Sequence, residues 1–312
     1  MAVYTLDWNA MPPGDCRRGA VSIGNFDGVH RGHAALLAEL RRQADALGGP
    51  AVALTFDPHP IELLRPELSP PRLTTTEDRS QLLLKLGADC VLVLRATHEL
   101  LALRAKDFFA EMVQKRLQAQ ALVEGSNFGF GRGREGDVGT LAELCEPAGI
   151  GLTVVPPVLL DGIEVSSSRI RAALTTGNVR EAASLLGRPY RLNGLVGTGQ
   201  RRGQKLGFPT ANLEQVRTLI PGDGVYAVRV PHESKKWPGA ANVGPNPTFG
   251  ENARKVEIHL IGFEGDLYGK PLAVDFLERL RDTLPFKNVT ELVEQLRRDI
   301  DQAQRIAGEE RT

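Results

Sequence analysis

Two histidines three positions apart, His30 and His33, stand in the glycine-rich stretch Gly24–His33, which reads GNFDGVHRGH. The stretch follows the apolar run Ala20–Ile23 and precedes a segment with helical periodicity. Backbone N–H groups at the start of a helix attract phosphate, and glycine lets a ligand approach the backbone closely. Each imidazole can donate a hydrogen bond to a phosphate oxygen, and that bond strengthens as charge develops in a transition state. The stretch therefore predicts a phosphate-binding loop; the alternative is a plain turn with two incidental surface histidines.

A hexapeptide further along the chain could complete such a site. The stretch Ser166–Arg171 reads SSSRIR and places serine hydroxyls at the start of a predicted helix, followed by Arg169 and Arg171. An arginine here can hold the β- and γ-phosphates of ATP through charge-assisted, bidentate hydrogen bonds. Alone, the hexapeptide indicates an ordinary capped helix with solvated arginines. Together with His30 and His33 it favours a nucleotide site.

Two further stretches suit a flat ligand. TFDPHP ends a predicted strand and puts Asp57 and His59 at the carboxyl edge of the sheet, where ligands bind in open α/β folds. Because His59 lies between two prolines, we expect it to shape the loop or the substrate wall rather than act as an acid or base. GSNFGFGRGREGD combines Asn127 and Phe128, which suit a heteroaromatic ring that needs stacking and edge hydrogen bonds. The alternative for this glycine-rich loop is flexibility alone.

The strongest single motif is GTGQRRGQKLGFPTAN, at residues 197–212. Its glycines and the cations Arg201 and Lys205 can wrap nucleotide phosphates. Residues two apart on an extended segment point the same way, so Thr210 and Asn212 present a hydroxyl and an amide carbonyl together. These hard oxygen ligands suit a Mg²⁺ ion that keeps waters and bridges ATP phosphates.

The elements that must position the first motifs alternate between continuous apolar runs and helical periods. The predicted strands are Ala20–Ile23, Ala51–Phe56, Cys90–Leu94, Ala121–Glu124 and Gly151–Val155. The predicted helices are His33–Leu47, Thr76–Leu86 with Thr76 as its N-cap, Lys106–Leu117 and Thr140–Ala148. Continuous apolar strands separated by helices indicate a Rossmann-like α/β domain with a mostly parallel sheet covered on both faces.

After about Leu186 the pattern changes to short β-rich runs separated by glycine and proline. These predicted strands are Tyr190–Val196, Val225–Val230, Gly239–Val243, Lys255–Ile261 and Leu272–Leu277. In this part the segment Thr290–Ile306 keeps a helical period. The pattern predicts a small antiparallel β-barrel closed by a C-terminal helix. We place the boundary at Gly187, which gives domains of residues 1–186 and 187–312.

Length and composition set the class of protein. The 312 residues suffice for two domains that each bury a core. Lys plus Arg equals Asp plus Glu at 38 each, so no overall field draws the protein to nucleic acid or a membrane. No basic segment precedes an apolar one and no apolar run reaches about 18 residues, so we expect neither a signal peptide nor a membrane span. Cys16, Cys90 and Cys145 lack CxxC spacing, which argues against a disulfide framework or a zinc site and indicates small buried side chains in a reducing cytoplasm.

The motifs also carry a family resemblance. His-x-Gly-His at a helix start resembles the signature of nucleotidyltransferases that transfer AMP or CMP from a nucleoside triphosphate; it is neither a Walker A loop nor a GxGxxG fingerprint. IGNFDGVHRGH, TFDPHP, NFGFGRGREGD and VSSSRIR occur in this order, and PTAN follows them. Together they resemble the bacterial bifunctional riboflavin kinase/FMN adenylyltransferases, the prokaryotic FAD synthetases, from about residue 18 to residue 305.

For adenylyl transfer, the resemblance implies catalytic roles for His30, His33 and Arg169. The implied ATP-binding residues are Gly24, Asn25, Phe26, His30, His33, Ser166, Ser167 and Arg169. The implied FMN-binding residues are Asp57, His59, Asn127 and Phe128.

For the kinase, the resemblance implies a second ATP site with Mg²⁺ on Thr210 and Asn212. The implied ATP-binding residues are Gly197, Gly199, Arg201, Gly203, Lys205, Gly207, Pro209, Thr210 and Asn212. Alternation in KVEIHLI puts Glu257 and His259 on one face. By resemblance Glu257 is the general base for the ribityl 5′-hydroxyl, and Glu257 and Arg281 contact riboflavin. We expect His259 to be a neighbouring strand residue rather than a second base.

The resemblance implies phosphorylation of riboflavin by ATP to FMN, then AMP transfer from a second ATP to FMN, giving FAD and pyrophosphate. The implied partners are small molecules in the cytoplasm, not nucleic acid or a membrane, and a homo-oligomer is left open. One alternative is a related enzyme acting on another acceptor, such as nicotinamide mononucleotide or phosphopantetheine, against which PTAN argues. Another is a flavin-binding or regulatory protein with one silent module, against which the intact motifs argue. Departures from the family pattern are Ser168 in place of threonine, GSN without an acidic residue, and Thr283 in place of glutamate.

Overall fold

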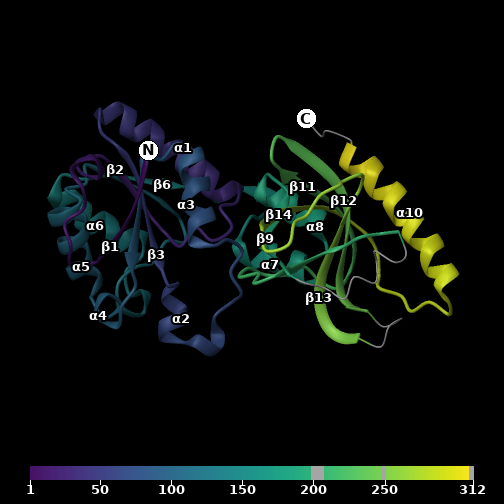
Figure 1. The fold of residues 1–312 in the computed structure, drawn as a ribbon. Coiled ribbons are helices and arrows are strands. Elements are labelled where there is room, and N and C mark those ends of the chain that lie inside the picture. Colours follow the sequence, from purple (N-terminus) through teal and green to yellow (C-terminus); the bar gives the residue numbers. More distant parts are fainter. Residues whose placement is uncertain (198–206, 247–250, 309–312) are drawn as a thin grey trace. The chain divides into compact units, whose positions relative to one another are not determined.

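Two separate sheets organise the chain in the computed structural model, which describes residues 1–197, 207–246 and 251–308 (Figure 1). One unit comprises Met1–Pro70 and Thr74–Ser166, and the other comprises Pro71–Leu73 and Ser167–Thr312. Each unit therefore buries its own core.

The first unit contains a six-stranded sheet in which every pairing is parallel. Its strands are β1 (Ala2–Asp7), β2 (Ala20–Ile23), β3 (Ala51–Asp57), β4 (Cys90–Arg95), β5 (Ala121–Gly125) and β6 (Gly151–Val155). Their order across the sheet is β1-β4-β3-β2-β5-β6. The order reverses direction at β2 and β5, which makes the carboxyl ends of these two strands the switch point where open α/β sheets bind ligands.

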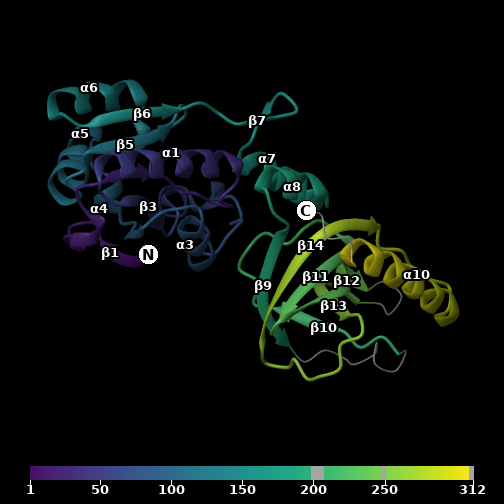
Figure 2. The ribbon, with the colours of Figure 1, turned by 90° about the horizontal axis from the view of Figure 1, so that it is seen from above.

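Helices cover both faces of this sheet, as the continuous apolar strands predict. They are α1 (Arg31–Leu47), α2 (Pro60–Leu64), α3 (Thr76–Lys85), α4 (His98–Leu101), α5 (Ala105–Phe108), the π-helical η3 (Phe109–Arg116) and α6 (Val138–Ala148). On one face Val21 and Leu92 pack in a core that includes residues of α5, η3 and α6. On the other, Ala53 and Val91 pack in a core that includes residues of α1 and α3. Figure 2 shows the same layers from above.

Three details differ from the sequence predictions. The hydroxyl of Thr75, rather than Thr76, caps α3 by accepting a hydrogen bond from the N–H of Asp78 at 3.1 Å. The segment Lys106–Leu117 divides between α5 and the π-helical η3. Strand β1 was not predicted, because at the edge of the sheet its residues alternate between half-buried and exposed instead of forming a continuous apolar run. Short elements complete the unit: the 3₁₀ turns η1 (Gly14–Cys16), η2 (Pro66–Leu68) and η4 (Arg132–Arg134), and the hairpin β7 (Leu159–Leu160) with β8 (Ile163–Glu164).

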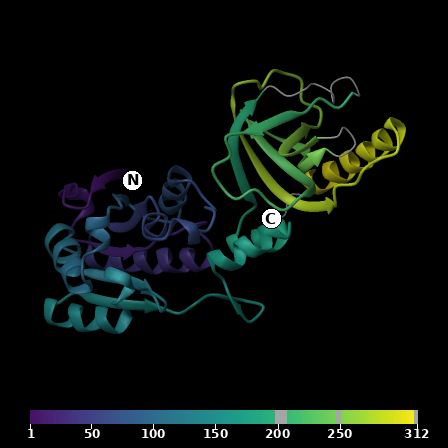
Figure 3. The ribbon, with the colours of Figure 1, turned by 90° about the horizontal axis from the view of Figure 1, so that it is seen from below.

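The second unit contains the predicted closed antiparallel barrel (Figure 3). Its strands are β9 (Tyr190–Gly197), β10 (Ala211–Glu214), β11 (Gly224–His232), β12 (Lys235–Asn246), β13 (Glu251–Leu260) and β14 (Pro271–Arg281), in the order β10-β13-β12-β11-β14-β9. The C-terminal helix α10 (Val289–Gly308) packs on β11, β12 and β14. Within the described ranges, no helix combines the length and the apolar character needed to cross a membrane.

Two helices precede the barrel within the second unit, α7 (Ser167–Thr175) and α8 (Val179–Leu186). Helix α8 packs on β9 and β14, and it ends at Gly187, whose φ of 74° gives the left-handed cap typical of glycine. The barrel strands begin at Tyr190, just after the predicted boundary. The helices α7 and α8 thus pack with the barrel unit, and the boundary at Gly187 stays a prediction for where the functional modules divide.

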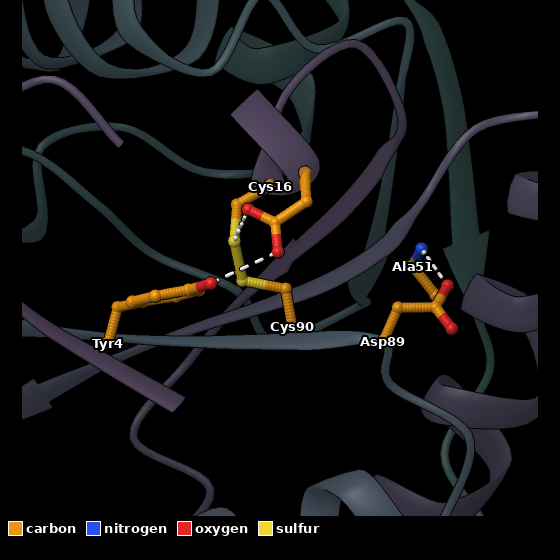
Figure 4. Close-up of a disulfide and its surroundings, with 6 residues drawn as sticks. Tyr4, Cys16, Ala51, Asp89 and Cys90 are labelled. Atoms are coloured by element: carbon orange, nitrogen blue, oxygen red, sulfur yellow. Dashed lines mark hydrogen bonds between the residues drawn. A yellow bond between two sulfur atoms is a disulfide. The ribbon is translucent and has the colours of Figure 1, made fainter. Parts of the chain in front are cut away.

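The expectation that the cysteines are unpaired is wrong for Cys16 and Cys90, which form a disulfide (Figure 4). The residues are 74 positions apart, but η1 lies against the start of β4 and brings their Cα atoms within 5.8 Å. Both sulfurs are buried, and next to them the hydroxyl of Tyr4 donates to the Asp15 carboxylate at 3.1 Å. Sequence spacing could not indicate this pairing, because it depends on tertiary packing. Cys145 is free and buried, as predicted.

We expect reduction of this disulfide to destabilise the first unit selectively. A cross-link across 74 residues restricts the unfolded chain, and its loss should lower the free energy of unfolding by about 4 kcal/mol. Each unit contains one tryptophan, Trp8 and Trp237, so a Trp237→Phe background lets fluorescence report on the first unit alone. Urea unfolding with and without reductant, in the parent and in Cys90→Ala, measures the effect. An unfolding midpoint that reductant leaves unchanged in the parent would contradict the prediction.

Candidate active sites

The phosphate loop between β2 and α1 is held in an unusual backbone conformation. Phe26, Gly28 and Val29 have positive φ angles of 49°, 83° and 43°. The buried Asp27 fixes the loop, because its carboxylate accepts hydrogen bonds from the backbone N–H and the hydroxyl of Thr74, both at 3.1 Å. That hydroxyl in turn accepts a hydrogen bond from the N–H of Gly28 at 3.1 Å. The loop geometry therefore depends on a residue 47 positions away in sequence.

The side chains of His30 and His33 contact each other at the start of α1. Their rings stack with centroids 3.7 Å apart, and the ring of Phe26 meets His33 edge-on at 5.3 Å. The N–H of His30 donates to Nδ1 of His33 at 3.3 Å. In the neutral imidazole of His33 the proton then lies on Nε2, which makes this atom the donor. The contact brings the two histidines together, and their role at the phosphates stays a prediction.

Glycine fits the tight space between the two histidines. A Cβ at Gly32 would lie 3.0 Å from Cε1 and 3.1 Å from Nδ1 of His30, closer than side-chain contacts normally allow. A Cβ at Gly24 would lie 3.3 Å from the ring of Phe26. These glycines let the rings pack against the backbone, which explains the His-x-Gly-His spacing in physical terms.

Arg79 is a buried residue of this region that the sequence did not single out. From α3 its guanidinium donates to the carbonyl of Asn25 at 3.0 Å and to the carbonyl of Phe56 at 2.9 Å. The hydroxyl of Thr55 donates to the same Asn25 carbonyl at 3.2 Å. Arg79 thus ties the phosphate loop to the end of β3. The sequence did contain a signal that Arg79 is buried, because Arg79 precedes the buried Leu83 by four residues and so lies on the apolar side of its helix.

The motif TFDPHP forms the end of β3 and the start of α2. Asp57 is the last residue of β3, at the carboxyl edge of the sheet as predicted. His59 caps α2, and its Nδ1 accepts a hydrogen bond from the N–H of Ile61 at 3.2 Å. This contact agrees with the interpretation of His59 as a residue that shapes the loop.

The loop after β5 brings an amide and aromatic rings together. The rings of Phe128 and Phe130 stack with centroids 5.4 Å apart. The side-chain N–H of Asn127 donates to Glu164 at 3.3 Å, and the backbone carbonyl of Asn127 accepts a hydrogen bond from Arg134 at 3.0 Å. These contacts hold the loop in place beside the carboxyl end of β5, and contact with FMN stays a prediction.

Glu124 is a second residue that the sequence did not single out. It is the penultimate residue of β5 and only 1% exposed, and its carboxyl accepts a hydrogen bond from the N–H of Ile23 at 2.8 Å. Burial raises the pKa of Glu124 well above its ordinary value, and the bond from Ile23 partly opposes that rise. Cys145 of α6 faces it; burial, and then the Glu124 carboxylate, raise the pKa of that thiol to about 11.

Replacing Glu124 by glutamine should make the first unit less sensitive to pH. The folded-state pKa of Glu124 lies above the ordinary value of 4.5, so the stability that its protonated form confers falls as pH rises from 4.5 through the raised pKa. Cys145 stays neutral over this range. The unfolding free energy of Glu124→Gln minus that of the parent should therefore increase with pH and then level off. Urea unfolding of both proteins in the Trp237→Phe background, at pH values from about 4 to about 8, measures it; a difference independent of pH would contradict it.

The motif SSSRIR spans the change from one unit to the other. Ser166 ends the first unit, and Ser167 begins α7 in the second. In α7, Nε of Arg169 donates to the carboxylate of Glu181 in α8 at 3.1 Å, and Nε of Arg171 donates to the carbonyl of Pro71 at 2.8 Å. Arg169 is therefore oriented by an acidic partner that the sequence analysis did not predict. The approach of Arg169 to the histidines stays a prediction.

In the barrel, strand register brings the PTAN motif and Glu257 together. On β13, Glu257 lies opposite Asn212 of β10 on one side and Asn242 of β12 on the other. Directly opposite residues of antiparallel strands share a face, and the buried Val256 and Ile258 occupy the inner face. The three polar side chains therefore form a row on the outer face of the barrel. Asn242 was not among the predicted site residues.

His259 contacts the same motif. Its Nδ1 lies 2.8 Å from the carbonyl of Pro209, and its ring meets Phe208 edge-on with centroids 5.8 Å apart. These contacts agree with the expectation that His259 is a supporting strand residue. It holds the segment before Thr210 against β13.

The other predicted kinase residues divide between described and undescribed positions. Gly197 ends β9 opposite Asn212, and Gly207 has a φ of 88° that suits glycine. Arg281 of β14 donates through Nη2 to the buried Asp299 of α10 at 2.7 Å, in a partly buried pair that anchors the C-terminal helix. Its predicted contact with riboflavin stays a prediction. The predicted residues Gly199, Arg201, Gly203 and Lys205 lie outside the described residues.

The donor set around PTAN fits a hard cation with few protein ligands. Thr210 and Asn212 offer a hydroxyl and an amide oxygen. Such oxygens suit Mg²⁺, which keeps several waters and binds largely through ATP phosphates. In residues 1–197, 207–246 and 251–308, no three His, Cys, Asp or Glu side chains are grouped to hold a metal on their own.

A parallel α/β unit with a histidine-lined phosphate loop defines the nucleotidyltransferase class, and a barrel that sets PTAN beside a glutamate defines the flavokinase class. The sequence matches the family described as FAD synthetase over residues 13–169 and the family described as riboflavin kinase over residues 186–307. The chain belongs to the family of bifunctional riboflavin kinase/FMN adenylyltransferases, with the FAD synthetase module first and the riboflavin kinase module second.

Several relatives align along nearly the whole chain. The bifunctional riboflavin kinase/FMN adenylyltransferase of Pseudomonas fluorescens is 39% identical over 293 residues, which are 93% of this chain and 94% of the relative. The protein of the same description from Escherichia coli K12 is 37% identical over 280 residues, 89% of this chain and 90% of the relative. A solved structure described as a macrolide-efflux protein from Streptococcus pneumoniae has a TM-score of 0.87 and 31% identity, covering 97% of this chain and 99% of that one.

Proposed function

We propose that the predicted residues divide FAD synthesis between two sites in this chain, each with its own ATP. The observation that carries the assignment is the barrel register, which sets Asn212 of PTAN directly opposite Glu257. In the first unit, the stacked histidines at the start of α1 supply the corresponding observation.

At the barrel, Glu257 accepts the proton of the ribityl 5′-hydroxyl of riboflavin. The 5′ oxygen then forms a bond to the γ-phosphorus of ATP while the bond to the bridging oxygen breaks, which gives FMN and ADP. Thr210 and Asn212 would hold a Mg²⁺ ion, and His259 contacts the carbonyl of the preceding Pro209. When bound, Mg²⁺ neutralises the phosphate charge that would otherwise repel the attacking oxygen.

At the phosphate loop, an oxygen of the FMN phosphate attacks the α-phosphorus of the second ATP. The bond to pyrophosphate breaks, and FAD forms without a covalent enzyme intermediate. His30 and His33 hydrogen-bond the phosphates where charge develops, and Gly24, Asn25 and Phe26 shape the loop around them. Ser166, Ser167 and Arg169 hold the leaving pyrophosphate, with Arg169 oriented by Glu181. Asp57, His59, Asn127 and Phe128 form the FMN side of the site.

The remaining proposals concern the partners, the cellular location and the oligomeric state of the protein. Balanced charge supports small molecules, rather than nucleic acid or a membrane, as partners. A cytoplasmic location fits these substrates, and FMN is released from one site before it binds at the other. A homo-oligomer is compatible with the chain.

Removal of Mg²⁺ tests the kinase part of the proposal. With riboflavin and ATP, excess EDTA should abolish FMN formation, and added Mg²⁺ should restore it. Thr210→Val and Asn212→Leu should each raise the Mg²⁺ concentration needed for half-maximal rate, because a hydroxyl or an amide ligand is lost. The matched control is Thr218→Val, a threonine in the segment after β10 and outside the row. FMN formation that EDTA does not affect would overturn the metal assignment.

A further inference from the structure

The strands that carry the two substrate loops of the first unit separate before they reach those loops. Strands β2 and β5 pair at Ala20 with Ala121 and at Val21 with Leu122, and their pairing ends there. On its other side β2 stays paired with β3 through Ile23. The gap opens at the switch point of the sheet, the position at which open α/β sheets bind ligands.

The side chain of Glu124 spans this gap. Its carboxyl oxygen accepts the N–H of Ile23 at 2.8 Å, while the next N–H, that of Gly24, donates to the carbonyl of Leu54 in β3 at 3.0 Å. The last amides of β2 are therefore held from both sides. Gly24 begins the loop that ends at His30, the residue before α1 and His33, so the direction in which that loop leaves the sheet depends on both bonds.

The same residue lies next to the second loop. Glu124 precedes Gly125, whose carbonyl accepts the N–H of Phe128 at 3.0 Å in the turn that carries Asn127. One side chain thus connects the end of β2 to the strand end from which the predicted FMN loop begins.

A carboxyl group is costly at this position. Glu124 is 1% exposed, and burial disfavours its charged form, whereas an apolar side chain of similar size would carry no such penalty. The carboxyl supplies a hydrogen-bond acceptor for the N–H of Ile23, which lies beyond the last backbone pair between β2 and β5. An unsatisfied buried N–H at Ile23 would let the strand end move.

We propose that Glu124 is a positioning residue for adenylyl transfer, which fixes the phosphate loop relative to the FMN loop by bonding the N–H of Ile23. The inference rests on the proposed function of the first unit. Small displacements of reacting groups have large kinetic effects, so loss of this bond acts on turnover as well as on stability.

Three variants test the bond. Glu124→Gln keeps an oxygen acceptor of the same reach, Glu124→Met removes it, and Glu124→Asp keeps a carboxyl that is one methylene too short. The rate of FAD formation from supplied FMN and ATP is measured well below the melting temperature of each variant. Riboflavin phosphorylation by the barrel of the same chain serves as the internal measure of active protein. Val123→Ala, a buried change on the same strand, is the control for destabilisation without loss of the acceptor.

We expect Glu124→Met and Glu124→Asp to lower kcat for FAD formation by about tenfold or more. Glu124→Gln should stay within about threefold of the parent, and phosphorylation should be unchanged in all three variants. Val123→Ala should lower the melting temperature and keep kcat. If Glu124→Met and Glu124→Asp kept the parental kcat, the inference would be overturned. It would also be overturned if Glu124→Gln lowered kcat as much as Glu124→Met does. If Glu124→Met does not fold, the comparison of kcat between Glu124→Asp and Glu124→Gln tests the inference. A parent that phosphorylates riboflavin but forms no FAD would overturn the proposed function as well.

Discussion

Replacing His33 by alanine is expected to abolish FAD formation from supplied FMN while riboflavin is still converted to FMN. In the proposed mechanism the donor on Nε2 of His33 stabilises charge that develops on the phosphates, and loss of one such donor should lower kcat by about 10²–10³-fold. Alanine also removes the ring that stacks on His30 at 3.7 Å and the acceptor for its N–H. Chromatography of riboflavin, FMN and FAD measures both activities in one protein.

Two conservative changes separate these effects. Asparagine places an acceptor near the position of Nδ1 and lacks a donor at Nε2, whereas glutamine places an amide near Nε2. We therefore expect His33→Asn to be as inactive as His33→Ala in FAD formation and His33→Gln to keep part of the activity. If asparagine restored activity and glutamine did not, His33 would act only through the bond from His30, and its role at the phosphates would be wrong.

Replacing Glu257 by glutamine is expected to have the opposite effect, with riboflavin phosphorylation lost and FAD formation from FMN retained. Glutamine keeps the size and hydrogen-bonding capacity of the side chain but cannot accept a proton, so kcat for FMN formation should fall by about 10²–10⁴-fold. The KM for ATP should change little, because the change removes the base and leaves Thr210 and Asn212 in place. Initial rates at saturating riboflavin and varied ATP measure both parameters.

A matched control is available in the same unit. Glu264 is an exposed carboxylate in the segment after β13, and Glu264→Gln removes one negative charge from the barrel without touching the row of Asn212, Glu257 and Asn242. It should leave FMN formation unchanged. Equal losses in the two glutamine variants would show that charge, and not a base at position 257, explains the result.

The parts of the fold that sequence predicted are those in which local pattern and tertiary role agree. The continuous apolar runs of β2 to β5 are largely buried on both faces of a parallel sheet, and the alternation in β13 separates an inner face from the one that carries Glu257. His30 and His33 were found because their spacing, the intervening glycine and the helix start all lie within one short stretch. Residues i and i+3 at a helix start are neighbours by geometry.

The parts that sequence did not predict depend on contacts between distant residues. Asp27 is hydrogen-bonded to Thr74, and Arg79 donates to the carbonyls of Asn25 and Phe56. Glu124 accepts a hydrogen bond from the N–H of Ile23, which is 101 positions away. A buried polar side chain is recognisable only when its partner is known, since the same residue on a surface would be solvated. The disulfide between Cys16 and Cys90 belongs to the same category.

In the barrel, the residues that lie next to one another depend on how the strands pair, which the sequence alone does not show. PTAN and KVEIHLI were each recognisable alone, but only the pairing of β10 with β13 shows that Asn212 lies opposite Glu257. The short strand β10, four residues long, carries too little pattern to be predicted as a strand. Asn242 joins the row for the same reason, through the pairing of β12 with β13.

A time course of the purified chain with riboflavin, ATP and Mg²⁺ tests the central claim most directly. Separation of the three flavins should show FMN appearing first and FAD following, with one ADP formed for each FMN and one pyrophosphate for each FAD. FMN that accumulates without FAD would contradict the assignment of the phosphate loop to adenylyl transfer. Flavin that binds without any turnover would contradict both assignments and favour a binding protein.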